Sequence, residues 1–273
     1  MRFPYTLLTI LTLLSLSSAM QAQSWRMVWS DEFNGADGSG FDTKRWTAQT
    51  GGDGWGNKEL EYYTAESKNV YLNKSGSLAI KAIKETLSPD YKCWYGGCQY
   101  TSARLMTKKK FQTAYGRFEA RIKIPYGQGV WPAFWLLGGN IDEAGWPSCG
   151  EIDVMENIGR EPSLVHGTIH GPGYSGDKGI GSSYSLARNQ LFAAGYHTFA
   201  VEWETDAIRW YVDGNLYETR TRADLPAGTK WVYDHPFFII LNLAIGGAWP
   251  GNPDATTTFP QTMLVDYVRV YQR

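Results

Sequence analysis

Three acidic residues lie close together in the short apolar stretch 150–157. Side chains alternate between the two faces of a strand, so Glu151 and Asp153 share one face while Glu156 points the other way. One extra residue, a β-bulge, would bring all three onto one face, and bulges recur beside active sites. Like charges held together repel and separate their pKa values, which suits an acid and a base better than a stable fold. The spacing therefore predicts a bulged strand with acid–base chemistry; the alternative is a solvated acidic strand edge.

The two glutamates have the residue type and the reach to cleave a glycosidic bond. In a retaining enzyme, that reaction needs one carboxyl group that attacks the anomeric carbon and one that donates a proton, with oxygens about 5–5.5 Å apart. Glu151 and Glu156 meet this requirement if they converge over the concave face of a curved sheet, where Asp153 would tune both pKa values. A cation site is the alternative, but a single strand surrounds an ion poorly. The motif therefore favours acid–base catalysis without a cofactor.

The rest of the chain has the pattern of strands that could position these acids. Residues 116–124 alternate between apolar and charged side chains, as in a strand with one buried face. Residues 198–220 predict two or three strands with a hairpin turn at Asp213-Gly214, 237–245 a buried central strand, and 264–271 another strand. No stretch has the periodicity and caps of an amphipathic helix. We therefore predict an all-β fold, an antiparallel β-sandwich of jelly-roll type with a concave substrate cleft.

The composition limits the class of partner. The formal net charge is −1, which argues against nucleic acid, because phosphate binding needs a basic surface. Aromatic residues make up 15% of the chain and include twelve tryptophans, while charged residues make up only 19%. Aromatic faces stack on the apolar faces of sugar rings, so this balance fits a neutral carbohydrate ligand; a large β core explains it equally well.

Residues 1–22 have the pattern of a secretory signal peptide. A charged start is followed by an apolar run too short to span a bilayer and then by small residues, with cleavage expected after Ala19 or Ala22. Residues 23–273 contain no internal repeat, linker or later transmembrane stretch, so we expect one catalytic domain. The mature protein is expected to be secreted, extracellular or periplasmic, and to be a monomer that does not associate with a membrane.

The cysteines and two of the histidines have structural explanations. Cys93 and Cys98 flank a tight loop and could form a disulfide in an exported protein, which leaves Cys149 as a small packed residue. His166 and His170 have the spacing of zinc ligands on a helix, but their glycine and β-branched neighbours argue against a helix, and the glutamate of the zinc motif is missing. We therefore expect neither a cysteine nucleophile nor a zinc ion.

The acidic motif and its neighbours resemble glycoside hydrolase family 16, in particular its laminarinase branch, the endo-β-1,3-glucanases. The matching motifs are Trp-Ser-Asp-Glu-Phe-Asn at 29–34, Gly-Trp-Gly-Asn-Lys-Glu-Leu-Glu-Tyr-Tyr at 54–63, Trp-Pro-Ala-Phe-Trp-Leu-Leu at 131–137, Trp-Pro at 146–147, Gly-Glu-Ile-Asp-Val-Met-Glu at 150–156, His-Gly-Thr-Ile-His-Gly at 166–171 and Asp-Tyr-Val-Arg-Val-Tyr at 266–271. The extra residue Met155 also matches this branch, since the mixed-linkage and xyloglucan branches have a shorter spacing without a bulge.

The resemblance implies a role for each acid and a set of binding residues. Glu151 would be the nucleophile, Glu156 the general acid/base and Asp153 the assisting carboxylate. The residues expected to contact the substrate are Asn57, Arg104, Trp131, Trp135, Trp146 and His170. Simpler explanations exist for several of them: the face shared by Trp131 and Trp135 could be core, and Asn57 and Arg104 could be a turn residue and an ion-pair partner.

The resemblance also implies one structural calcium ion, with Glu32, Gly76 and Asp266 as its ligands. Strand alternation places Asp266 on the same face as Leu264 and Val268, and a carboxylate on an apolar face must be paired or must bind a metal. An ion-paired or hydrogen-bonded Asp266 is the alternative to calcium.

Together these expectations define a secreted hydrolase that cleaves β-1,3-glucan of the laminarin type internally, with retention, through a covalent glycosyl-enzyme. Its partner would be a β-glucan polysaccharide. The alternatives within the family are a mixed-linkage β-1,3-1,4-glucanase, a galactan hydrolase and a transglycosylase. A non-catalytic β-glucan-binding protein on the same fold is the alternative outside catalysis, but such relatives usually lack the carboxylates that are all present here.

Overall fold

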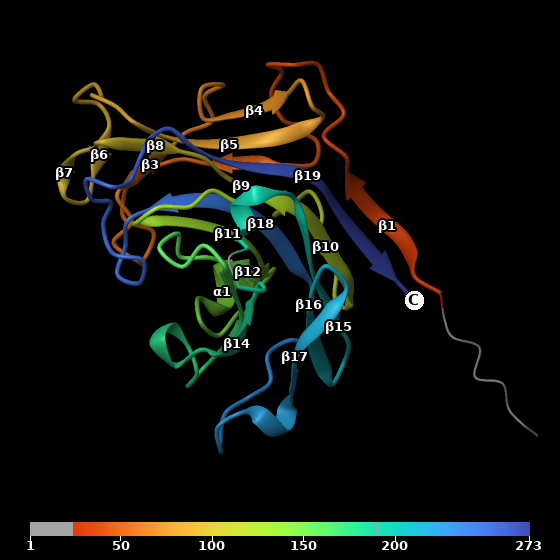
Figure 1. Cartoon of the computed structure of the whole chain (residues 1–273). Helices are drawn as coiled ribbons and strands as arrows, with labels where there is room; N and C mark the ends of the chain where they lie inside the picture. Colours follow the sequence, from red (N-terminus) through yellow and green to blue (C-terminus); the bar gives the residue numbers. More distant parts are fainter. Residues whose placement is uncertain (1–23, 189) are drawn as a thin grey trace, which may run out of the picture.

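The computed structural model describes residues 24–188 and 190–273, which fold into two β-sheets stacked face to face (Figure 1). The predicted signal peptide, 1–22, lies outside these residues and stays a prediction. The predicted jelly-roll sandwich is confirmed, and its strands are antiparallel except for one parallel pair between residues 61–63 and 100–102.

The larger sheet has ten strands. They are β1 (Arg26–Asp31), β3 (Glu61–Tyr63), β4 (Val70–Asn73), β5 (Ser77–Lys84), β8 (Tyr100–Ser102), β10 (Gly116–Lys123), β15 (His197–Trp203), β16 (Ala207–Val212), β17 (Asn215–Thr221) and β19 (Gln261–Gln272). Their order is β17–β16–β15–β10–β19–β5–β8–β3, with β1 paired to β19 and β4 paired to β5. The sheet is therefore joined at β19, which bonds to β10 on one side and to β5 and β1 on the other.

The smaller sheet has seven strands and carries the acidic motif. They are β2 (Thr47–Gln49), β9 (Arg104–Met106), β11 (Val130–Gly138), β12 (Glu151–Glu156), β13 (Leu164–His170), β14 (Ile180–Ser185) and β18 (Phe237–Ile245). Their order is β14–β13–β12–β11–β18–β9–β2. A separate hairpin of β6 (Lys92–Cys93) and β7 (Gly96–Gly97) is closed by the predicted Cys93–Cys98 disulfide.

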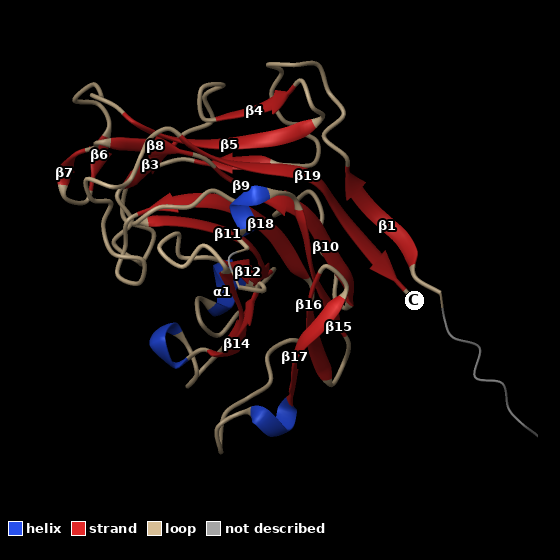
Figure 2. Ribbon diagram, in the orientation of Figure 1, coloured by secondary structure: helices blue, strands red, loops and turns tan. Residues whose placement is uncertain are grey.

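Helices are short among the described residues (Figure 2). They are α1 (Ile141–Ala144), η1 (Gly176–Lys178), η2 (Phe192–Ala194) and η3 (Arg222–Asp224). No helix in this part of the chain has the length and apolar character needed to cross a membrane.

The main core lies between the sheets, where strand alternation buries one face of each strand. In β10, Phe118, Ala120 and Ile122 are buried while the charged residues between them are partly exposed, as predicted. The predicted hairpin is also confirmed: Asp213 and Gly214, both with positive φ, join β16 to β17. The sandwich thus provides a rigid support for the opposite, outward face of β11 and β12.

The strand β18 is buried along its whole length, as predicted for a central strand. Its inner face joins the main core, and its outer face packs Phe238 and Ile240 into a second, smaller apolar cluster with Leu137 and Cys149. Cys149 is therefore a packed residue, as expected, and burial raises the pKa of its thiol to about 11. This cluster covers one end of the outer face and leaves the other end to polar side chains.

The sequence-based placement of Asp266 is wrong. Val265 and Val268 are both buried, because the pairing of β19 with β10 shifts register between them, and Asp266 is the extra residue of this bulge. Asp266 therefore lies on the partly exposed side, away from Val268, and its Oδ2 accepts a hydrogen bond of 2.7 Å from Arg121. The paired Asp266 that the sequence left as an alternative to calcium is what the structure contains.

The expected calcium ligands are engaged elsewhere. Both carboxylate oxygens of Glu32 accept hydrogen bonds from the Arg269 guanidinium, at 3.0 and 2.7 Å, and Arg121 holds Asp266. Gly76 lies in the turn between β4 and β5 with a φ of +72°. As they are arranged, both carboxylates are paired with guanidinium groups, with which an ion would have to compete. The calcium site stays a prediction.

Candidate active site

The predicted bulge is present in β12. Glu156 is paired with Ala133 of β11 and Asp153 with Trp135, so one residue too many separates the two acids. Val154 is the residue without a partner on β11, one position before the Met155 that the sequence singled out. Both are buried, and all three acids consequently emerge on the outer face of the sheet.

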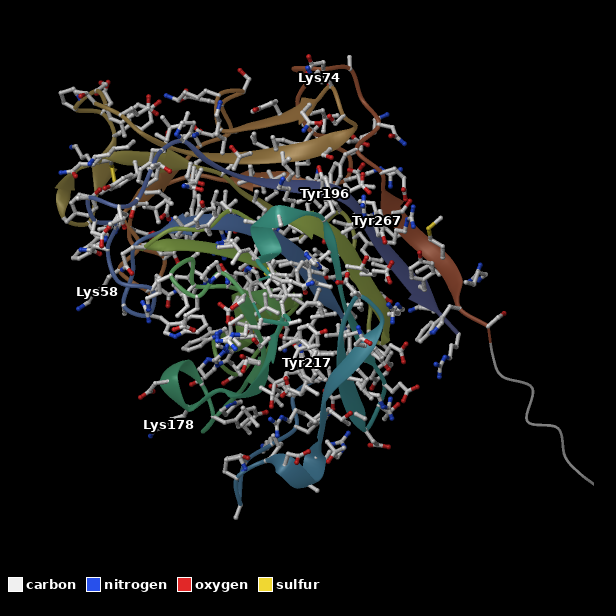
Figure 3. All side chains as sticks on the ribbon, viewed as in Figure 1. Lys58, Lys74, Lys178, Tyr196, Tyr217 and Tyr267 are labelled. Carbon is white, nitrogen blue, oxygen red and sulfur yellow. A yellow bond between two sulfur atoms is a disulfide. The ribbon has the colours of Figure 1, made fainter. Side chains whose placement is uncertain are left out.

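The larger sheet supports the bulge from behind. Trp210 of β16 donates a hydrogen bond of 2.7 Å from its indole Nε1 to the backbone carbonyl of Asp153. Gly167 of the neighbouring β13 leaves space for this ring and for Tyr217, since a Cβ at Gly167 would come within 2.5 Å of both. Figure 3 places Tyr217 in the interior, among the side chains that lie between the sheets. The carbonyl of the bulged strand is thus satisfied without water.

Each acid has its own partner. Trp146 donates from Nε1 to Glu151 Oε2 at 2.9 Å, and Trp131 donates from Nε1 to Glu156 Oε1 at 3.0 Å. A ring nitrogen of His170, Nε2, lies 3.1 Å from Asp153 Oδ2 and 3.8 Å from Glu151 Oε1. The two glutamates are therefore held by indoles from opposite ends of the strand, with Asp153, only 2% exposed, between them.

Burial sets the protonation of the cluster. Desolvation, helped by the charge of Asp153, raises the pKa of Glu151 to about 8, while His170 and the Trp146 indole act against this rise. Burial also raises the pKa of Asp153 to about 8 and, with repulsion from Asp153, raises the pKa of Glu156 well above its usual range. Three carboxyl groups this close cannot all be ionised. The cluster retains protons near neutral pH, and Glu156 is well suited to hold one.

Arg104 lies between two indole rings and forms the side of the site that is next to β9. The guanidinium carbon of Arg104 lies 4.8 Å from the ring centroids of both Trp55 and Trp135, and its Nε donates to Gln49 Oε1 at 2.7 Å. The predicted Trp135 is thus at the site, and Trp55 joins it. Arg104 is not paired with an acid, which removes the simpler explanation for this residue.

A chain of side-chain hydrogen bonds connects Asn57 to Trp135. Asn57 Nδ2 donates to Glu59 Oε1 at 3.0 Å, and the Tyr63 hydroxyl donates to Glu59 Oε2 at 2.9 Å. Tyr63 in turn accepts from Asn242 Nδ2 at 3.2 Å, while Asn242 Oδ1 accepts from Trp135 Nε1 at 2.7 Å. Asn57 lies in a turn, and the chain orients its side-chain amide; its role as a substrate contact stays a prediction.

We expect Glu59→Gln to raise KM about tenfold and to change kcat much less. A glutamine offers one acceptor oxygen where Glu59 offers two, so Asn57 or Tyr63 loses its acceptor at a cost of about 1–3 kcal/mol. Asn57 would then lose its fixed orientation, and steady-state kinetics on a soluble glucan would separate KM from kcat.

Glu61→Gln is the matched control for Glu59→Gln. Burial and the charge of Glu59 raise the pKa of Glu61 well above its usual range, so it is a neutral acid that an amide can imitate. Its Oε2 accepts from the backbone of Ile245, which an amide oxygen can also do. Equal KM values for Glu59→Gln and the wild type would contradict the positioning role of Glu59.

The side of the site next to Trp131 includes a residue that was not predicted from the sequence, Trp249. Trp249 packs edge-to-face on Trp131, with ring centroids 5.5 Å apart, and on His166 at 5.0 Å. Burial lowers the pKa of His166, which keeps this ring neutral. Trp249 carries no sequence signal of its own, whereas Asn242 is the one polar residue in an apolar strand and could have been found.

The structure brings all nine predicted catalytic and substrate residues together. Six of them are the three acids of β12 or side chains that contact these acids. Trp135 is paired with Asp153 through the backbone, and Arg104 and Asn57 are linked to Trp135 through the contacts described above. Among the described residues, one group of acids and histidines could hold a metal ion, and it is Glu151, Asp153 and His170. All three belong to the site described above.

Two stacked sheets with a buried carboxyl cluster between aromatic walls define the protein as a glycoside hydrolase. Residues 55–269 match the family described as Glycosyl hydrolases family 16. The chain belongs to this family. The fold, the family and the enzyme class predicted from the sequence are therefore confirmed.

Three known proteins show how close the similarity is. The chain is 42% identical to a protein from Rhodothermus marinus named beta-glucanase, over 92% of this chain and 87% of that protein. Its structure is similar to the laminarinase catalytic domain from Thermotoga maritima MSB8, with a TM-score of 0.85, 48% identity, and 92% and 99% of the two chains covered. It is also similar to an endo-beta-1,3-glucanase from Pyrococcus furiosus, with a TM-score of 0.84, 50% identity, and 91% and 94% covered.

Proposed function

We propose that this protein cleaves β-1,3-glucan chains internally, with retention of the anomeric configuration. The observation that carries the proposal is the bulge, which puts Glu151 and Glu156 on one face with a separate indole donor for each. The names of the similar proteins, a beta-glucanase, a laminarinase and an endo-beta-1,3-glucanase, support the choice of substrate.

In the first step, the ionised Glu151 attacks the anomeric carbon while the glycosidic carbon–oxygen bond breaks. Glu156 gives its proton to the departing oxygen, which leaves as a sugar hydroxyl, and a glycosyl ester forms on Glu151. His170 and Trp146 favour the ionised form of Glu151, and Glu156 keeps its proton because burial raises its pKa.

In the second step, water attacks the same carbon from the side the leaving group occupied. Glu156, now ionised, accepts the proton of the water, and the bond to Glu151 breaks to restore its carboxylate. Two inversions at one carbon give net retention. Asp153 stays buried between the glutamates, with Nε2 of His170 at 3.1 Å from its Oδ2.

The experiment follows the products on laminarin, curdlan, lichenan and agarose. We expect soluble oligosaccharides from laminarin and curdlan, with a rapid fall in viscosity because an enzyme that cleaves internally shortens the chains from the first cuts. Proton NMR of the first products should show the β-anomer before mutarotation. Products from agarose alone would contradict the substrate, and the α-anomer first would contradict retention.

We also propose that the protein is exported as a monomer. The signal pattern of residues 1–22 supports export, and so does the Cys93–Cys98 disulfide, since disulfides persist in oxidising compartments.

A further inference from the structure

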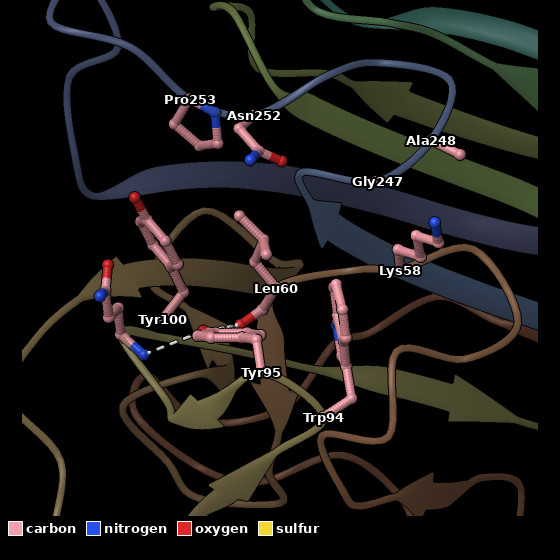
Figure 4. A pocket seen from close by; sticks show the side chains of 10 residues that line it. Lys58, Leu60, Trp94, Tyr95, Tyr100, Gly247, Ala248, Asn252 and Pro253 are labelled. Atoms are coloured by element: carbon pink, nitrogen blue, oxygen red, sulfur yellow. Dashed lines mark hydrogen bonds between the residues drawn. The ribbon is translucent and has the colours of Figure 1, made fainter.

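A hollow lies at the end of the sandwich where Figure 1 labels β6 and β7, and Figure 4 shows it from close by. Its volume of about 490 Å³ is within the range of roughly 300–1,000 Å³ typical of small-ligand sites. Three loops form it, and Figure 4 shows Trp94 and Tyr95 on one side, Asn252 and Pro253 on the other, and Lys58 toward the edge. We call it the end pocket.

The aromatic side of the end pocket is held rigidly. Trp94 is 49% exposed, yet its Nε1 donates a hydrogen bond of 2.7 Å to the carbonyl of Glu59. The Tyr95 hydroxyl donates to the carbonyl of Leu60 at 2.6 Å, and the disulfide closes the loop that carries both rings. An exposed indole fixed in this way offers a flat apolar face without an ordering cost on binding.

The polar groups of the end pocket suit a neutral, hydroxyl-rich ligand. Within the described chain, the side-chain amides of Gln99 and Asn252 and the ammonium group of Lys58 make no hydrogen bond to protein, and no carboxylate lines the pocket. Aromatic faces with amides around them match the apolar faces and hydroxyl edges of a sugar ring.

The end pocket and the active site share a wall. Lys58 follows Asn57 in the chain, and the backbone N–H of Ala248 donates to the carbonyl of Asn57 at 2.8 Å. Gly247 lines the pocket on one side, while a Cβ on it would lie 3.4 Å from the Trp131 ring on the other. The end pocket is therefore adjacent to Asn57 and Trp131, two of the residues expected to contact the substrate.

We infer that the end pocket is an accessory binding site for a segment of the polysaccharide remote from the cleaved bond, with Trp94 as its stacking platform. This inference rests on the proposed β-glucan substrate. The site would add affinity for long chains only, because a short oligosaccharide that fills the cleft does not reach Trp94.

The test compares Trp94→Ala with the wild type on laminarin and on a short β-1,3-gluco-oligosaccharide. We expect KM for laminarin to rise about three- to tenfold, with both kinetic constants for the short substrate unchanged. Trp94→Phe keeps an aromatic face and should recover most of the affinity. Asn252→Ala provides a second test at the opposite side of the pocket if Trp94→Ala does not fold.

The outcomes separate this inference from the proposed function. Wild-type enzyme that does not hydrolyse laminarin contradicts the proposed function itself. Normal hydrolysis with unchanged KM values in both Trp94→Ala and Asn252→Ala overturns the accessory site alone. An equal rise in KM for the short substrate in Trp94→Ala also overturns it. That result would mean that loss of the Trp94 hydrogen bond to Glu59 alters the active site itself.

Discussion

Glu151→Gln lowers kcat/KM for laminarin by about 10⁴-fold or more while the protein stays folded. A glutamine has the shape of the carboxylic acid and still accepts the 2.9 Å hydrogen bond from Trp146, but its amide oxygen is not a nucleophile. Burial already disfavours the ionised carboxylate and raises its pKa to about 8, so a neutral amide adds no desolvation cost. Initial rates and thermal unfolding by circular dichroism measure the two effects.

Glu143→Gln is the control for Glu151→Gln. Glu143 is an exposed acid in α1, on the same side of the sheet, and its loss should leave both activity and unfolding temperature at wild-type values. A well-folded Glu151→Gln protein with near-normal hydrolysis would remove Glu151 from the mechanism.

Glu156→Ala lowers kcat on laminarin by about 10²- to 10⁴-fold and spares a substrate with an activated leaving group, such as a dinitrophenyl glycoside of a β-1,3-glucan oligosaccharide. A sugar hydroxyl leaves only when it is protonated, whereas dinitrophenolate leaves without a proton. The first step on the activated substrate therefore does not need Glu156, and a burst of dinitrophenolate should appear before slow hydrolysis of the ester.

The pH profile gives an independent readout of Glu156→Ala. Glu156 must be protonated for the first step, so wild-type kcat/KM falls as the pH rises through its elevated pKa. The variant should lose this alkaline limb on the activated substrate and keep the acidic limb, which reports ionisation of Glu151. Equal losses on both substrates would count against the proton-donor role.

The sequence was sufficient to predict that the three acids share one face, because the side chains of a regular strand alternate between its two faces. The spacing of Glu151, Asp153 and Glu156 is incompatible with a regular strand, so the bulge followed from the residues alone. The same rule was wrong at Asp266, where a second bulge moves the carboxylate to the other face. A carboxylate on an apolar face indicated a conflict there too, but ion pairing and metal binding explained it equally well, so the bulge was not predicted.

The contacts of the supporting residues could not be predicted because they join positions that are remote in the chain. Asn242 bonds to Tyr63 across 179 positions, and Trp210 bonds to the carbonyl of Asp153 across 57. Neither contact produces a periodic pattern in the sequence, because each depends on how the two sheets stack. The acids and the residues that contact them directly were therefore predictable, whereas these long-range contacts of Asn242 and Trp210 were not.

The position of β19 has a consequence for how the protein is made. Its 12 residues bond to β10 on one edge and to β5 and β1 on the other, so the larger sheet is two separate halves until they arrive. On a ribosome, every other strand of both sheets emerges before β19. A half of the sheet that forms before β19 pairs therefore exposes an unpaired edge at β10 or β5, and such edges are the surfaces through which β-proteins aggregate. The topology places the exposure of these edges before the pairing of the last strand.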